Sequence, residues 1–129
     1  MPSISAPPLR PASFLVAMLR SMLGQYQRET RKLKTNRAKL RTKLNEALAE
    51  DKGQWQTWVK EVEETIQKAD QHELCTELLV ERATSMHPTD KTQGDYQQMA
   101  TELEAHLKSM EYHVDGIKLA NKRYSGHVS

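Results

Sequence analysis

The chain has 129 residues and a formal net charge of +2; 37% of its residues are hydrophobic, 5% aromatic and 28% charged. The length fits one domain, but an apolar share below the usual half argues for narrow helical stripes, or for a core completed by a partner. So small a net charge indicates no particular partner, and the single cysteine excludes an intrachain disulfide and favours a reducing intracellular compartment, cytoplasmic or nuclear.

The N-terminal residues 1–12 hold four of the five prolines and predict a disordered tail. Ser13 is the expected N-cap of a helix that starts at Phe14. Residues 1–28 contain arginines and serines but no acid, and from Phe14 onward they are amphipathic. This composition also fits a mitochondrial transit peptide, so the mitochondrial matrix is the alternative compartment.

The first predicted helix spans residues 14–50, with Gly24 as a weak point inside it. Its stripe alternates in steps of four and three residues, interrupted by polar groups at Thr30 and Arg37. The glycine-containing stretch "EDKG" at 50–53 is expected to end this helix. The stripe consists of Leu19, Leu23, Tyr26, Thr30, Leu33, Arg37, Leu40, Leu44 and Ala47.

The second predicted helix spans residues 54–86 and ends before His87–Pro88. Beyond Ala69 the same register would bury Glu73. Asp70 and Glu73 have capping-box spacing, which predicts a kink or restart near residue 70. The stripe before this break consists of Trp55, Val59, Val62, Ile66 and Ala69, and a rotated face after it of Leu74, Leu78 and Leu79.

The third predicted helix spans residues 96–121, after a loop at 88–95. Asp95 is the expected N-cap, with Gln98 in the reciprocal position, and residues 123–129 are expected to fray. The stripe of this helix is the most regular in the chain and consists of Tyr96, Ala100, Leu103, Leu107, Met110, Val114 and Ile117.

These elements predict an all-α fold whose helical bundle domain spans residues 13–122. Short loops favour an elongated antiparallel three-helix bundle with coiled-coil-like packing, or four helices if the chain breaks near residue 70. The residues predicted to form the core, or an interface with a helical partner, are Leu33, Leu40, Leu44, Trp55, Val59, Val62, Ile66, Leu103, Leu107, Met110, Val114 and Ile117.

Charge is distributed in blocks along the chain. Residues 28–43 carry eight basic groups and one acid, whereas residues 44–82 carry ten acids and four basic groups. A basic helix of this density suits nucleic-acid phosphates, and anionic lipid headgroups would suit the same face. The alternative is a solvated face, or one that pairs with the chain's own acidic block. The basic side chains are Arg28, Arg31, Lys32, Lys34, Arg37, Lys39, Arg41 and Lys43.

No pattern predicts a catalytic residue, a cofactor site or a metal site. The glycine motifs that bind phosphates are missing. His72 and Cys75 stand three residues apart on a helix, but a structural zinc site needs four ligands, and His87 is their only close neighbour in sequence. His106 and His113 lack the Glu-x-x-His pattern of carboxylate-bridged metal bundles.

The two tryptophans, Trp55 and Trp58, are expected to anchor the core or an interface rather than to stack on bases. A basic-zipper protein is excluded, because Leu33 and Leu40 lie inside the basic stretch and no zipper follows it. No run of apolar residues is long enough to cross a bilayer.

No motif identifies a family. A basic helix followed by acidic amphipathic helices resembles, in outline, the helical N-terminal region of retroelement Gag-type proteins, which implies self-assembly and association with nucleic acid. The tryptophan-bearing helix and three-helix plan resemble spectrin-like repeats.

We therefore expect a non-enzymatic helical interaction or assembly protein. It would associate through the apolar stripes of its helices, with itself or with a helical partner. The alternative is a nucleic-acid-binding helical protein that uses residues 28–43; a helical enzyme built around His72, Cys75 or His106 is the third hypothesis.

Overall fold

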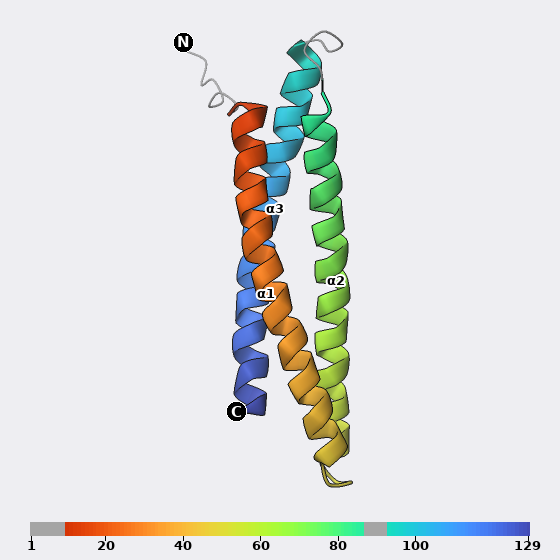
Figure 1. Ribbon diagram of the computed structural model, residues 1–129. Coiled ribbons are helices and arrows are strands. Elements are labelled where there is room, and N and C mark those ends of the chain that lie inside the picture. Colours follow the sequence, from red (N-terminus) through yellow and green to blue (C-terminus); the bar gives the residue numbers. More distant parts are fainter. Residues whose placement is uncertain (1–9, 87–92) are drawn as a thin grey trace, which may run out of the picture.

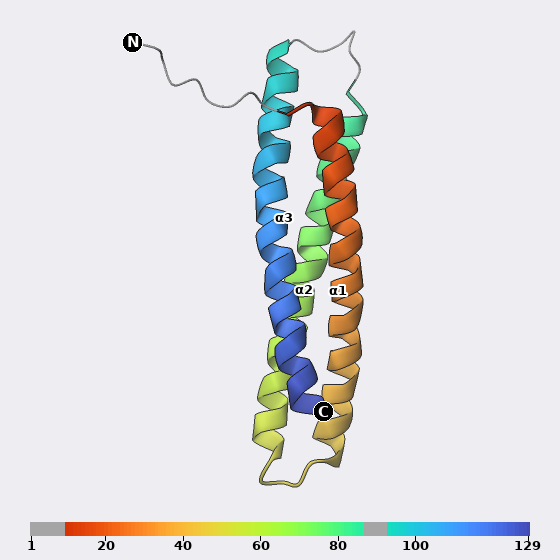
Figure 2. The same ribbon diagram turned by 90° about the vertical axis from the view of Figure 1, so that its left-hand side faces the viewer.

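The computed structural model describes residues 10–86 and 93–129, and within these residues it contains helices and no strand. The helices are α1 (Ala12–Glu46), α2 (Lys52–Thr84) and α3 (Gln93–Val128). In Figure 1 the chain runs down along α1, up along α2 and down again along α3. Figure 2 shows the same narrow outline a quarter turn away. At 1.5 Å per residue each helix is about 50 Å long, so the molecule is a rod.

The ends of α1 differ from the predicted ones. α1 begins at Ala12, and Ser13 lies inside its first turn instead of capping it. Pro11 precedes the helix, where a proline is tolerated because the N–H that it lacks would have no helical partner. α1 ends at Glu46, and Gly53 lies inside the first turn of α2, so the stretch 50–53 does not end the first helix. Residues 1–9 of the predicted tail lie outside the described residues.

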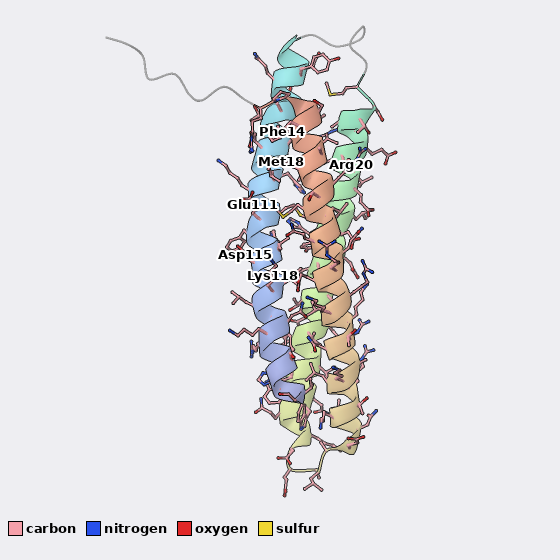
Figure 3. All side chains as sticks on the ribbon, turned by 60° about the vertical axis from the view of Figure 1, so that its left-hand side comes forward. Phe14, Met18, Arg20, Glu111, Asp115 and Lys118 are labelled. Atoms are coloured by element: carbon pink, nitrogen blue, oxygen red, sulfur yellow. The ribbon has the colours of Figure 1, made fainter. Side chains whose placement is uncertain are left out.

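Arg10 ties the start of α1 to α3. Its Nε and Nη2 atoms each donate a hydrogen bond to the carboxylate of Glu104, both at 2.6 Å. The same guanidinium lies 5.7 Å from the centre of the Phe14 ring, and its Nη1 is 3.4 Å from the sulfur of Met18. In Figure 3, Phe14 and Met18 lie on the α3 side of α1, and Arg20 lies on the opposite side. Arg10, placed in the predicted tail, is therefore part of the folded structure.

α2 is one continuous helix across residue 70, so the predicted break is wrong. Its buried side keeps the three-four alternation through Ala69, Glu73, Thr76 and Val80. Glu73 does not force a break because it is only half-buried, and its Oε1 accepts a hydrogen bond of 2.8 Å from Nε2 of Gln27 on α1. A long side chain at the edge of a seam can keep its charged end in polar surroundings while its stem packs.

The leucines that follow residue 70 do not form a second buried face. Leu74 and Leu78 are 55% and 56% exposed, and Leu79 is half-buried against the core. The buried residues at this level are Thr76 and Val80. The predicted rotation of the apolar face is therefore wrong for Leu74 and Leu78.

α3 is longer than predicted at both ends. It begins at Gln93, so Asp95 lies in its first turn and is not its N-cap. A carboxylate in the first turn still favours the helix, because the amide dipoles leave partial positive charge there. α3 continues to Val128, so the predicted frayed tail at 123–129 is almost wholly helical. Tyr124 is only 3% exposed, which explains why the last turns stay ordered. The predicted stop at His87–Pro88 lies outside the described residues.

The core is a ladder of apolar side chains from all three helices. Nine of the twelve predicted core or interface residues are buried, namely Leu33, Leu40, Val62, Ile66, Leu103, Leu107, Met110, Val114 and Ile117; Leu44, Trp55 and Val59 are half-buried. Leu15, Leu19 and Tyr26 add the N-terminal part of the ladder. The amphipathic pattern that also fits a transit peptide thus has an explanation inside the fold.

α1 packs closely against both other helices, whereas α2 and α3 come close to each other at few positions. Some polar side chains are buried inside the bundle, namely Thr30, Asn36, Thr76 and Asn121. Of the helices described, none holds a stretch apolar and long enough to cross a bilayer.

Candidate functional site

The basic stretch 28–43 lies in the second half of α1. Seven of its eight basic side chains are exposed, and Arg37 is half-buried. The buried side chains between them, Leu33 and Leu40, hold this part of α1 in the bundle. The stretch therefore presents its charges outward from a packed helix.

Part of the stretch is paired within the chain. The guanidinium of Arg41 forms an ion pair with Glu63 on α2, and Nζ of Lys34 lies 3.6 Å from Oδ1 of Asp70. These two pairs link the basic block of α1 to the acidic block of α2. Both lie at the surface, where a pair contributes about 0–1 kcal/mol and favours one register more than it adds stability.

Among the described residues, the other six basic side chains of the stretch form no ion pair with α2, although Arg31 lines a hollow that also includes Glu73 of α2. Lys32 pairs with Glu29 one turn earlier, at 3.3 Å. The remaining five have no acid of residues 10–86 and 93–129 within ion-pair distance, namely Arg28, Arg31, Arg37, Lys39 and Lys43. The stretch is thus divided between internal pairing with α2 and basic groups that remain available to an anion.

A polar hollow between α1 and α3 collects four lysines. We call it the basic groove; its volume is about 490 Å³, and it is lined by Lys32, Lys39, Lys118 and Lys122 together with Glu29, Thr35, Asn36, Asn121 and Ser125. In Figure 3, Glu111, Asp115 and Lys118 follow one another down one side of α3, so acidic residues precede the groove on that helix. Lys118 and Lys122 were not among the predicted site residues. Their four-residue spacing beside the seam position Ile117 is the signal that could have found them.

Two asparagines form the floor of the basic groove. Asn36 and Asn121 are each only 7% exposed. Nδ2 of Asn36 donates to Oδ1 of Asn121 at 3.1 Å, and Nδ2 of Asn121 donates to the backbone oxygen of Glu29 at 2.9 Å and to its Oε2 at 3.1 Å. Because a buried polar group costs free energy unless it is paired, this arrangement favours one alignment of α1 against α3.

Three histidines meet between α2 and α3, and we call them the histidine cluster: His72, His106 and His113. The ring centre of His72 lies 3.8 Å from that of His113 and 5.5 Å from that of His106. Nε2 of His106 is 2.7 Å from Oγ1 of Thr76, and Nε2 of His72 is 3.3 Å from Oγ of Ser109. The predicted helix spacings did not bring these three residues together, because two of them are on a different helix from the third.

The surroundings disfavour protonation of His72 and His106. Burial lowers the pKa of His72, and His113 and His106 lower it further by repulsion. Burial also lowers the pKa of His106, with a further contribution from His113. On the α1 side of His72, burial raises the pKa of Tyr26 to about 12, with smaller contributions from Glu73 and Asp70. Desolvation disfavours the charged form of each of these groups.

The hydroxyl group that lies beside His106 is buried. Thr76 and His106 are close enough for a hydroxyl to be activated, but Thr76 has no exposed surface, so a substrate could not reach its hydroxyl. Cys75 is exposed. Within residues 10–86 and 93–129 no three His, Cys, Asp or Glu side chains are placed to hold a metal ion. His87, the neighbour considered in the sequence, lies outside the described residues.

The tryptophans belong to the first turns of α2, the part of this helix at the lower end of the rod in Figure 1, and both are half-buried against the core. The rings of Trp55 and Trp58 meet edge to face, with centres 4.9 Å apart. Trp58 is also stacked on His127 of α3, with ring centres 3.9 Å apart and an interplanar angle of 7°. Both tryptophan rings therefore pack against other side chains of the same chain.

Comparison of the chain with protein-family models, with curated proteins and with solved structures finds no significant match. The resemblances to Gag-type proteins and to spectrin-like repeats therefore gain no support. The fold and the two polar sites define an elongated helical bundle with a basic groove on one side and a histidine cluster on another.

Proposed function

We propose that this chain is a non-enzymatic helical interaction protein, built as an elongated antiparallel bundle of three helices with coiled-coil-like packing. The observation that carries this proposal is the burial of three-four spaced side chains along all three helices. Helices that pack along their whole length form a stiff rod. A stiff rod holds the binding groups on its surface at fixed distances from one another.

Self-association of the chain would use the same seams. Because these residues are already buried inside one chain, two chains can share them only by exchanging a helix. The close contact of α1 with both neighbours and the few contacts between α2 and α3 make α2 or α3 the helix more easily exchanged.

The association is tested by measuring the mass in solution over two orders of magnitude of concentration, by sedimentation velocity. We expect a dimer whose fraction grows with concentration. As a matched experiment, two differently tagged versions of the chain are refolded together or mixed after folding. Copurification only after joint refolding supports helix exchange, whereas a compact monomer at every concentration contradicts self-association.

A second candidate function is the binding of nucleic acid along α1. The observation that favours it is that five of the eight basic side chains of residues 28–43 have no acid within ion-pair distance in the described part of the chain. Phosphates would release counterions on binding to such a surface, so the affinity would fall steeply with salt.

This candidate is tested with a four-fold charge reversal, Arg28, Arg31, Lys39 and Lys43 to Glu. The matched control reverses four basic residues outside the stretch, Arg20, Lys52, Lys60 and Lys68 to Glu, so both variants have the same net charge. We expect binding of an oligonucleotide at low salt to be abolished only in the first variant. Equal loss in both variants, or no binding by the unmodified chain at low salt, contradicts the candidate.

A further inference from the structure

The lysines of the basic groove are brought together by the alignment of two helices. Lys32 and Lys39 come from α1, and Lys118 and Lys122 come from α3. The paired amides of Asn36 and Asn121 lie between them and favour the alignment that sets these lysines opposite one another. The four lysines therefore come together because α1 packs against α3, and not because they belong to one basic segment.

Of the residues that the structure describes, Glu29 is the only acid that lines the groove, and its carboxylate already has partners. One of its oxygens pairs with Lys32, and the other accepts a hydrogen bond from Asn121. Among the described residues, no acid is within ion-pair distance of Lys39, Lys118 or Lys122. Like charges around one hollow repel each other, and a bound anion would replace that repulsion by attraction.

The size of the groove selects among anions. Its α1 wall extends from Glu29 to Lys39, a rise of about 15 Å along the helix. A single phosphate ion would reach only some of the four ammonium groups. A row of phosphates could meet all of them, since each lysine binds phosphate as a point charge with rotatable donors.

We propose that the basic groove binds a short chain of phosphate groups, and that Lys118 and Lys122 contribute to this site as much as Lys32 and Lys39. This goes beyond helical association, which uses the buried seams and leaves the groove open. Two sources share the chemistry, a free polyphosphate anion and the backbone of a nucleic acid, and the arms of the experiment separate them.

The test measures the binding of inorganic tripolyphosphate to the full chain by calorimetry, and by the amide NMR signals of the Asn36 and Asn121 side chains. The variant removes two groove charges, K118Q with K122Q. The matched control removes two exposed charges on α2, K60Q with K68Q. Helix content and melting temperature of both variants are compared with those of the unmodified chain, so that a folding defect is recognised.

We expect saturable binding that shifts both asparagine signals. The groove variant should bind about tenfold more weakly or worse, because each lost ammonium removes a charged contact with phosphate. The control variant should keep its affinity within about twofold, since nonspecific attraction by net charge is weak and screened. Equal weakening in both variants would show attraction to net charge alone and would overturn the proposal.

A single-stranded oligonucleotide provides the second arm. Displacement of the oligonucleotide by tripolyphosphate, with the same asparagine shifts for both ligands, supports one shared phosphate site. Oligonucleotide binding that tripolyphosphate does not compete with, or that leaves the asparagine signals unchanged, would place the nucleic acid elsewhere on α1. Absence of any tripolyphosphate binding at low salt overturns the groove proposal, whether or not the chain self-associates.

Discussion

The protonation of His72 and of His106 is coupled to the packing of the bundle. Their pKa values are lowered in the folded chain, first by burial and then by neighbouring histidines. His72 lines a hollow whose other titratable groups are Tyr26 from α1, Lys68 and Cys75 from α2, and His113 from α3. In the described part of the chain, no carboxylate is among the causes that set the pKa of either histidine.

The sign of the pH dependence follows from this lowering. Below pH 6.5 the unfolded chain takes up protons that the folded chain still excludes, so the free energy of unfolding falls as the pH drops toward the folded pKa values. We expect urea denaturation between about pH 5 and 8 to show this loss on the acidic side. The H72Q/H106Q variant should have a flatter profile. An unchanged slope in H72Q/H106Q would exclude the cluster as the cause.

Asn36 shows how a small error in the helical period misplaces one residue. The predicted stripe placed Arg37 on the buried side, but Asn36 is buried and Arg37 only half-buried. A straight helix with 3.6 residues per turn drifts by about 20° per heptad from a stripe drawn at 3.5. In α1 the predicted residues on either side, Leu33 and Leu40, are fully buried, so only the position between them is displaced by one residue. The floor of the basic groove was therefore not among the predicted positions.

At the scale of the helix, α2 illustrates the competition between local capping signals and packing. Asp70 and Glu73 have the spacing of a helix start, yet Asp70 pairs with Lys34 and Glu73 accepts a bond from Gln27. Both acids thus interact with side chains of α1, and α2 continues through these positions without a break. A capping signal is worth about 1 kcal/mol. Buried side chains on either side of the signal, such as Ile66 and Val80, outweigh it.

The burial pattern leads to a direct comparison between two leucines. Leu33 is fully buried, whereas Leu74 is 55% exposed. We expect Leu33→Ala to lower the free energy of unfolding by about 2–5 kcal/mol. Leu74→Ala should lower it by less than about 0.5 kcal/mol, because little buried surface is lost. Chemical denaturation measures both values. A large cost for Leu74→Ala would mean that its side chain is covered in solution.

At the scale of the whole molecule, the last turns of α3 pack against the first turns of α2, near the lower end of the rod. Tyr124 is buried there, Nη2 of Arg123 lies 3.1 Å from Oε2 of Glu61, and His127 is stacked on Trp58. These contacts link the last turns of the chain to the first turns of α2. They explain why the C-terminal residues are helical although their sequence is rich in polar groups.

Truncation of the chain tests whether the last turns of α3 stabilise the bundle. A chain that ends at Lys122 should lose about 3 kcal/mol of stability or more, because a buried aromatic side chain is removed. A chain that ends at Ser125 keeps Tyr124 but loses His127, the stacking partner of Trp58, and the half-buried Val128, so its loss should be smaller. Thermal unfolding followed by tryptophan fluorescence measures both. Equal stability of the two truncated chains would contradict a structural role for Tyr124.

The spacing of apolar residues along the chain was enough to predict an all-helical bundle and to name residues such as Leu40, Val62 and Leu107 that are buried. Periodicity reports which side of a helix is apolar, and the number of long periodic stretches gives the number of helices. The same pattern could not give the helix ends or the continuity of α2, since these depend on contacts with other helices.

The two polar sites required the fold. Lys39 and Lys118 share a groove, and His72 and His113 touch, although each pair is separated by many residues in the chain. Charge counted along the chain found the basic stretch but not the lysines of α3 that lie beside it. Periodicity is a local property of each helix, whereas the alignment between helices follows from the sum of many cross-helix contacts. That alignment brings distant side chains together.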